Sequence, residues 1–350
     1  MPWTVFSRSL IAAAALSLAA CSTSSVSPSA PLAPDAPTST TSPAPQQPAP
    51  LRIGLALGGG AAKGFAHIGV IKVLEANGLT PDMVAGTSAG SIVGALYASG
   101  MSPQALQKNA VALDENTISD LQWSTGGLIK GQKLQDYVNS QVQHQPLEKL
   151  GKPFVAVATR LEDGQRIVFA RGNTGQAVRA SSSIPGVFEP VQIAKQHYVD
   201  GGVVSPVPVE ATRELGADIV IAVDISDRPR GQKPNNLLDT MGQSITIMGH
   251  KLGQIELAQA DVTIRPEVLD IGPSDFTQRA QAIAEGEKAA LAAIPEIRAK
   301  IAELQFERQQ AAQQAMEETQ QARTPTCLQQ RSSWQKIAGF AGWTSDCPSP

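Results

Sequence analysis

Short apolar stretches alternate with helical patterns from residue 51 onward, and this alternation predicts the fold class. Apolar runs bounded by glycine or polar residues predict strands at 51–57, 83–86, 153–159, 166–170, 197–199, 218–223 and 262–264. Apolar positions three and four residues apart predict helices at 62–77, 90–99, 206–215, 236–256 and 277–320. The pattern predicts an α/β fold with a mostly parallel central sheet and helices on both faces.

The first fifty residues follow no such pattern. Arg8 precedes an apolar run from Leu10 to Ala20, which is too short to span a bilayer and is typical of a signal peptide over residues 1–20. The run ends in Leu-Ala-Ala-Cys21, which resembles the bacterial lipoprotein signal, whose cysteine is acylated. An ordinary secretory signal followed by an incidental cysteine is the alternative. Because Ser22 rather than an aspartate follows, the lipoprotein interpretation implies the outer membrane, facing the periplasm.

Proline and cysteine are unevenly distributed along the chain. Eight of the 25 prolines lie between residues 22 and 50, where the only charge is Asp35, so this segment is expected to be a disordered tether. Cysteine occurs only at Cys21, Cys327 and Cys347, which excludes a catalytic thiol or a cysteine-rich metal site from the central chain. In an exported protein the last two cysteines predict a disulfide, with free or intermolecular thiols as the alternative.

Charge narrows the possible partners. The 28 basic and 31 acidic residues give a formal net charge of −3, and no basic cluster is visible. Nucleic acid is therefore not expected as a partner, because phosphate binding requires clustered lysine and arginine. No cofactor and no metal are expected either.

Three glycine-marked turns carry the candidate chemistry. The first, Gly86-Thr87-Ser88-Ala89-Gly90, fits G-x-S-x-G between a predicted strand and a predicted helix. The two glycines relieve crowding in a sharp turn, so that the serine oxygen projects as a nucleophile and the Ala89 amide can stabilise an oxyanion. A serine that merely caps the helix is the alternative.

The second turn is the stretch Gly-Gly-Gly-Ala-Ala-Lys-Gly at residues 58–64. The position of Lys63 fits neither a P-loop nor a dinucleotide fingerprint. What remains is a nest of backbone N–H groups beside a helix N-terminus, suited to an anion such as the oxyanion of acyl transfer. Lys63 either adds positive charge to this nest or is a solvated side chain.

The third turn, Asp-Gly-Gly at residues 200–202, would by itself be an ordinary turn. A serine nucleophile, however, needs a base. Of the four histidines, His197 is expected on the opposite face of the strand from Asp200. His250 alone follows Asp200 in the Ser…Asp…His order of α/β-hydrolases, but it stands in a predicted helix.

These turns, in this order and with Ala-Ser-Ser-Ser-Ile-Pro-Gly-Val-Phe-Glu-Pro before the last, resemble the patatin-like phospholipase family over residues 53–215. The likeness is to its bacterial branch, which is similar to the catalytic domain of neuropathy target esterase. The resemblance implies Ser88 as nucleophile and Asp200 as base, without a histidine. It implies an oxyanion hole from Gly58, Gly59, Gly60, Ala61 and Ala89. The supporting motif residues are Lys63, Gly64, Gly86, Gly90, Gly201 and Gly202, with lysine where the family more often has arginine.

The implied activity is that of a lipid acyl hydrolase of phospholipase A or lysophospholipase type, working through an acyl-enzyme on membrane-derived esters. A Ser88–Asp200–His250 triad and a non-catalytic, lipid-binding envelope lipoprotein are the alternatives. The expected divisions are a signal peptide at 1–20, the tether at 21–50, the hydrolase domain at 51–270, a helical extension at 271–323 and a tail at 324–350. Residues 126–133 are expected to form a plain loop or a mobile lid.

Overall fold

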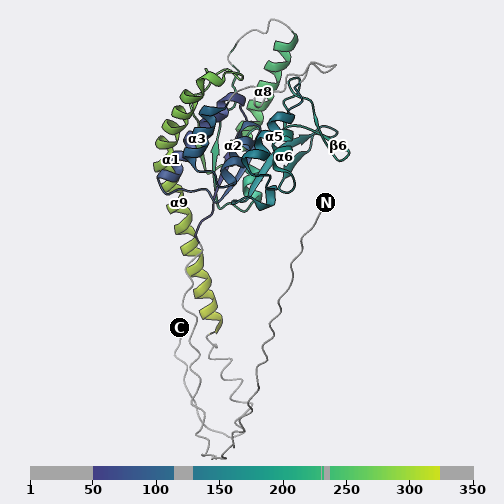
Figure 1. The fold of residues 1–350 in the computed structure, drawn as a ribbon. Helices are drawn as coiled ribbons and strands as arrows, with labels where there is room; N and C mark the ends of the chain where they lie inside the picture. The colour runs from purple at the N-terminus through teal and green to yellow at the C-terminus, as the bar shows by residue number, and fades with distance from the viewer. Residues whose placement is uncertain (1–49, 114–128, 230, 232–236, 324–350) are drawn as a thin grey trace, which may run out of the picture. The chain divides into compact units, whose positions relative to one another are not determined.

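A computed structural model describes residues 50–113, 129–229, 231 and 237–323 of the chain (Figure 1). The chain divides into two units, and the described residues belong to the second, which starts at residue 48. The expected signal peptide, Cys21, the tether up to residue 49 and the Cys327–Cys347 disulfide lie outside the described residues. So do the first three residues of the loop expected at 126–133; of the rest, Ile129 forms a β-bridge with Phe188, and a helix begins at Gln132.

One sheet carries the described strands, in the order β5-β6-β3-β2-β1-β7-β8, with β4 also paired to β3. The strands are β1 (Ile53–Leu57), β2 (Met83–Thr87), β3 (Phe154–Arg160), β4 (Arg166–Phe169), β5 (Val191–Ile193), β6 (Gln196–Asp200), β7 (Ile219–Val223) and β8 (Val262–Ile264). Strands β3, β2, β1, β7 and β8 are parallel, whereas β4 and β6 run antiparallel to β3. The prediction of a mostly parallel α/β sheet is therefore confirmed.

Helices connect the strands and cover the sheet (Figure 1). They are η1 (Ala61–Phe65), α1 (Ala66–Ala76), α2 (Ala89–Ala98), α3 (Pro103–Ala112), α5 (Gln132–Gln141), η2 (Leu147–Lys149), α6 (Thr174–Ser181), η3 (Gly201–Val203), α7 (Val209–Glu214), α8 (Leu237–Leu257), η4 (Phe276–Gln278) and α9 (Arg279–Arg323). The single helix expected at 62–77 begins as the 3₁₀ turn η1 before it continues as α1.

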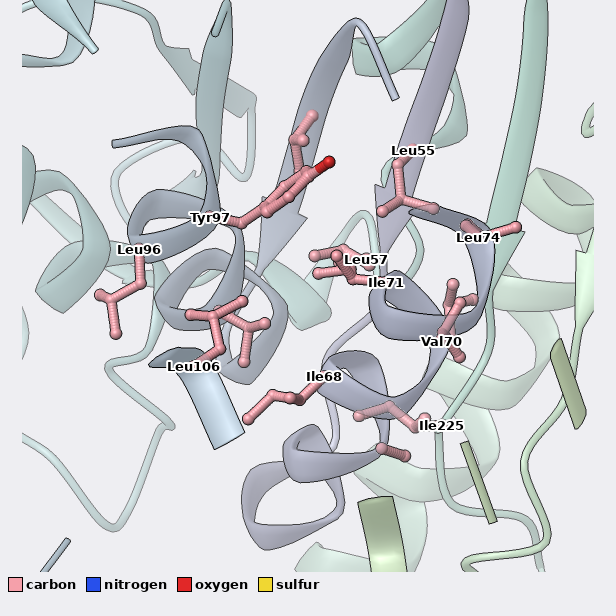
Figure 2. Close-up of a cluster of buried hydrophobic side chains, with 14 of the residues drawn as sticks. Leu55, Leu57, Ile68, Val70, Ile71, Leu74, Leu96, Tyr97, Leu106 and Ile225 are labelled. Atoms are coloured by element: carbon pink, nitrogen blue, oxygen red, sulfur yellow. The ribbon is translucent and has the colours of Figure 1, made fainter. Parts of the chain in front are cut away.

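The core lies on both faces of the sheet, which explains why β2 and β7 are buried at every position. On one face Leu55 and Leu57 of β1 pack with Ile71 of α1 and Tyr97 of α2, as Figure 2 shows. On the other face Ala56 belongs to a separate buried cluster, which includes residues of α7, β7 and the end of α8.

Helix α9 packs along α1, and two glycines allow this contact (Figure 1). A Cβ atom placed on Gly69 would lie 2.0 Å from the Ile283 carbonyl oxygen, and one on Gly286 would lie 2.0 Å from that of Ala66. Ile283 and Ile297 of α9 are buried in the main core. The boundary expected at residue 270 therefore does not mark the end of the packed core, which extends into the first half of α9.

The close α1–α9 crossing predicts that Gly69→Ala destabilises the fold. The new methyl group meets backbone rather than a flexible side chain, so the two helices must separate, at a cost of about 1–3 kcal/mol. Urea unfolding followed by circular dichroism measures this loss. Gly242→Ala in α8 is the matched control, because no heavy atom lies within 4 Å of its added methyl group. Equal stability of Gly69→Ala and the parent chain would contradict the crossing.

Candidate active site

Ser88 occupies the turn between β2 and α2. Its backbone has φ 53° and ψ −124°, a conformation that non-glycine residues rarely adopt and that costs on the order of 1–3 kcal/mol. The side chain is 6% exposed. The turn that the sequence predicts for G-x-S-x-G is therefore present, with its serine in a strained conformation at the N-terminus of α2.

The glycines of this turn are needed because the chain passes close to its neighbours. A Cβ atom on Gly90 would lie 2.1 Å from the Leu57 carbonyl oxygen, and one on Gly86 would lie 2.5 Å from that of Gly90. Both contacts are far shorter than any real Cβ contact, so no side chain fits at either position. The turn can therefore be this tight only with glycine on both sides of the serine.

The sheet register brings Asp200 to Ser88. Thr87, the last residue of β2, pairs with Val157 of β3, and the next residue of β3, Ala158, pairs with Asp200 at the end of antiparallel β6. The two candidate residues thus sit at the same level on either side of β3. The Ser88 hydroxyl donates a hydrogen bond to Asp200 Oδ2 over 2.5 Å.

The Asp200 carboxylate is buried and held on several sides. Its Oδ1 accepts from the Gly202 N–H at 2.7 Å, and its own carbonyl accepts from the Thr159 hydroxyl at 2.9 Å. Burial raises the pKa of Asp200 to about 6, against the opposing hydrogen bonds from Ser88 and Gly202. Asp200 is consequently a stronger base than an exposed aspartate, yet it still ionises near neutral pH.

Two further serines, outside the expected site residues, hold the turn in place. The Ser88 N–H donates to the Ser181 hydroxyl at 2.9 Å, and Ser181 in turn donates to the Val157 carbonyl at 2.6 Å. The hydroxyl of Ser91 donates to the Ser88 carbonyl at 2.7 Å. Ser181 belongs to the Ala-Ser-Ser-Ser block of the family resemblance, which was the only signal that could have pointed to it.

The glycine-rich loop lies beside Ser88, since a Cβ atom on Gly59 would come within 3.2 Å of the Ser88 Cβ. Two of the backbone amides expected in the oxyanion hole bond elsewhere. The N–H of Gly58 donates to the Val223 carbonyl at 3.1 Å, and that of Gly59 donates to the Pro206 carbonyl at 2.9 Å. These two amides are engaged within the fold and are not available to an oxyanion.

The remaining expected donors are the N–H groups of Gly60, Ala61 and Ala89. None of the three makes a hydrogen bond within the described part of the chain. Ala89 lies at the first turn of α2, where unpaired amides and the helix dipole favour negative charge.

Lys63 is fully buried and forms an ion pair with Asp227, in the segment that follows β7. The interpretation of Lys63 as a solvated side chain is therefore wrong. Its charge is neutralised by a carboxylate, so it ties the glycine-rich loop to the neighbouring segment.

His67 supports the glycine-rich loop from beneath. It is completely buried, and its Nε2 lies 2.8 Å from the Gly58 carbonyl oxygen. Burial lowers the pKa of His67 to about 4, so the ring is neutral at physiological pH and donates its Nε2 proton to this carbonyl.

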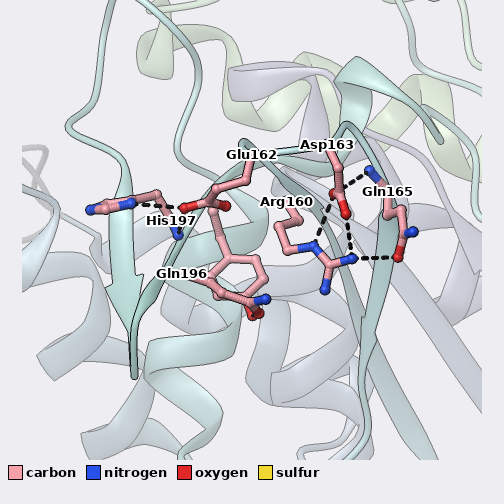
Figure 3. A network of polar contacts seen from close by, with 7 residues as sticks. Arg160, Glu162, Asp163, Gln165, Gln196 and His197 are labelled. Carbon is pink, nitrogen blue, oxygen red and sulfur yellow. Dashed lines mark hydrogen bonds and ion pairs between the residues drawn. The ribbon is translucent and has the colours of Figure 1, made fainter.

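Neither of the other histidines considered as a base reaches the dyad. His197 projects away and contacts Glu162 at 2.9 Å, in the polar network beside Arg160 in Figure 3. His250 lies on α8 and forms no hydrogen bond to Ser88 or Asp200 in the described structure. Within the described residues, the side chain that accepts the Ser88 hydroxyl hydrogen bond is that of Asp200.

Glu256 of α8 connects this helix to the segment that follows Asp200. It accepts hydrogen bonds from the Ser205 hydroxyl and, at 2.8 Å, from the Val207 N–H, and burial raises its pKa to about 7. The Ser205 carbonyl accepts from the Thr87 hydroxyl at 2.9 Å. The C-terminal end of α8 is therefore linked through Ser205 to Thr87, the residue before Ser88.

The described residues contain no group of three or more histidine, cysteine or acidic side chains arranged to hold a metal ion. Over the same ranges, none of the helices combines the length and apolarity needed to cross a bilayer.

Comparisons with known proteins show which proteins this chain is similar to. Residues 55–213 match the family model described as patatin-like phospholipase. An uncharacterized NTE family protein of Mycobacterium tuberculosis is 37% identical over 183 residues, which cover 51% of each chain. The human patatin-like phospholipase domain-containing protein 6 is 32% identical over 202 residues, which cover 55% of this chain and 14% of the human one.

The chain thus spans about half the length of the mycobacterial relative that it matches. Among solved structures, VipD from Legionella pneumophila is similar in fold, with a TM-score of 0.53 and 16% identity over 70% of this chain and 67% of VipD. The glycine-rich loop, the serine turn and the Asp-Gly-Gly turn all fall within the matched residues. Residues 55–213 of this chain therefore form a patatin-like phospholipase domain.

Proposed function

We propose that this chain is a lipid acyl hydrolase of phospholipase A or lysophospholipase type, which uses Ser88 as nucleophile and Asp200 as general base. The observation that carries the proposal is the 2.5 Å hydrogen bond from the Ser88 hydroxyl to a buried carboxylate. A serine needs a base within hydrogen-bond reach, and a carboxylate with a pKa near 6 is suited to act at neutral pH.

In the first half of the reaction, the Ser88 oxygen attacks the ester carbonyl carbon while Asp200 takes the serine proton. The carbonyl oxygen becomes an oxyanion, which accepts hydrogen bonds from the amides of Gly60, Ala61 and Ala89 in this proposal. The intermediate collapses when the bond to the alcohol breaks and Asp200 returns its proton to the departing oxygen. An acyl-enzyme on Ser88 and a free alcohol or lysolipid result.

In the second half, water takes the place of the alcohol. Asp200 removes a proton from this water as its oxygen attacks the acyl carbon, and the same amides stabilise the second oxyanion. Collapse breaks the bond to Ser88, whose oxygen regains the proton, and the fatty acid leaves. One carboxylate serves both halves, because it is regenerated after each proton transfer.

The dyad predicts large and similar losses from changing either partner. Ser88→Ala should lower kcat for a dissolved p-nitrophenyl ester by at least about a thousandfold, and Asp200→Asn by about 10²–10⁴-fold. Ser99→Ala, at the other end of α2, is the matched control and should keep full activity. Full hydrolysis by Ser88→Ala would rule out the proposal and favour the non-catalytic lipid-binding alternative.

The triad alternative is tested by His250→Ala. Because His250 makes no hydrogen bond to the dyad in the described structure, this variant should retain activity within about threefold of the parent chain. A loss as large as that of Asp200→Asn would replace the dyad with a Ser88–Asp200–His250 triad.

The raised pKa of Asp200 predicts how activity depends on pH. The base must be ionised in the free enzyme, so kcat/KM for a dissolved ester should fall below about pH 6 and reach a plateau above it. His250→Ala should leave the midpoint unchanged, because the histidine is not the titrating group. A midpoint near 4, or one that moves in His250→Ala, would contradict the assignment of Asp200.

We further propose that the chain is anchored to the bacterial outer membrane through an acylated Cys21. Its support is the residue pattern before the cysteine. Cells fed radiolabelled palmitate should incorporate label into the chain, and Cys21→Ser should abolish the labelling. Labelled Cys21→Ser would place the acyl group elsewhere.

A further inference from the structure

The side of α8 that faces solvent carries a row of apolar side chains. Met241, Ile245, Met248, Leu252 and Ile255 stand three or four residues apart and therefore lie on one side of the helix. Leu252 is half-buried, and the other four are 54%, 41%, 57% and 63% exposed in chain order. At 1.5 Å per residue the row is about 21 Å long.

The opposite side of α8 faces the protein and is less apolar. Gln243, Thr246 and His250 lie there and are half-buried, and Gly253 is buried. A surface helix normally directs its apolar side inward and its polar side to solvent. The larger part of α8 has the reverse arrangement, which is typical of a helix whose exposed side contacts another apolar surface.

The charge and the position of α8 indicate what this apolar surface is. Residues 240–250 contain no Asp, Glu, Lys or Arg. This part of α8 therefore lacks the charged side chains that usually cover the solvent-facing side of a helix in a soluble protein. In Figure 1 the first turns of α8 extend beyond the neighbouring elements. Lys251 borders the row and is exposed, which suits anionic lipid head groups.

Halfway along the row, beside Met248, α8 passes close to the turn that follows Asp200. A Cβ atom on Gly249 would lie 3.9 Å from the Gly202 carbonyl oxygen, in the turn that follows Asp200. Val203 in the same turn is 40% exposed. The hydrogen bonds of Glu256 fix the end of α8 to Ser205 and Val207. A surface that binds the exposed side of α8 therefore lies close to the turn that follows Asp200.

We propose that the row Met241, Ile245, Met248, Leu252 and Ile255 docks onto a lipid bilayer, with α8 lying in the plane of the membrane surface. Such helices sink about 5–10 Å into the boundary between head groups and acyl chains. This inference rests on the proposed function, because a lipid ester substrate resides in that surface and must leave it to reach Ser88. Docking would present the ester at the mouth of the site.

A fluorescent reporter on the row tests the docking directly. The full chain, with its three cysteines changed to serine, carries Met248→Cys labelled with the environment-sensitive dye NBD. Vesicles of phosphatidylethanolamine and phosphatidylglycerol should raise the emission severalfold and shift it to shorter wavelength. Vesicle lipids with a nitroxide on the acyl chain should then quench it. The same label at Leu291→Cys, an equally exposed site on α9, should not respond.

Three outcomes would overturn the docking proposal. The first is a label at Met248→Cys that does not respond to vesicles. The second is a blue-shifted signal without vesicles that grows with protein concentration, which would mean that a second copy covers the row. The third is such a signal at every protein concentration, which would mean that another segment of this chain covers it.

A kinetic comparison separates docking from catalysis. The variant Met241→Ser/Ile245→Ser/Met248→Ser should lower the ratio of the hydrolysis rate for an ester embedded in vesicles to that for a dissolved ester by at least about tenfold. The control Leu291→Ser/Phe306→Ser on α9 should leave this ratio unchanged. An unchanged ratio in the α8 variant would overturn docking alone. Failure of the parent chain to hydrolyse either ester would overturn the proposed function, and the reporter would still decide the docking.

Discussion

The hydrogen bond between Ser88 and Asp200 is the contact around which the proposed active site is organised. It exists because β6 runs antiparallel to β3 and ends level with the turn after β2, so that its last residue meets the serine. Burial at this place does two things at once. It raises the pKa of the carboxylate, which makes Asp200 a stronger base, and it keeps water away from the bond.

Much of the surrounding structure stabilises Ser88 and Asp200 in this buried and strained arrangement. The positive φ of Ser88 is maintained by the Ser181 hydrogen bond and by the close approach of Gly90 to β1. The glycine-rich loop is held by the neutral His67 and by the buried Lys63–Asp227 ion pair. Rigid placement of this kind is what electrostatic catalysis requires, because donors that are already oriented need not reorganise during the reaction.

The sequence alone predicted those parts of the fold whose signal is local. The strand at 262–264 coincides with β8, and the turn around Ser88 formed as its glycine spacing indicated. Helix α5 was missed because only a few of its residues, such as Leu134 and Val138, face the core, which leaves too little apolar periodicity. Helix α6 was missed because its inward side is made of small residues such as Gly175 and Ala177.

The partners within the site are less predictable, because they come from distant parts of the chain. Asp-Gly-Gly at 200–202 resembles an ordinary turn until β6 is placed beside β3, so the role of Asp200 came from the family resemblance. The contact between Ser88 and Ser181 joins residues 93 positions apart, and that between Ser205 and Glu256 joins residues 51 apart. The use of the Gly58 and Gly59 amides within the fold also depends on β7 and on the segment after Asp200. No local pattern contains this information.

The central claim is that the side-chain oxygen of Ser88, activated by Asp200, becomes acylated. The most direct measurement is reaction with a fluorophosphonate followed by peptide mass spectrometry, in the parent chain and in Asp200→Asn. The dyad predicts a single adduct on Ser88 that forms much more slowly in Asp200→Asn. An adduct on any other residue, or equal rates of labelling in the two chains, would contradict it.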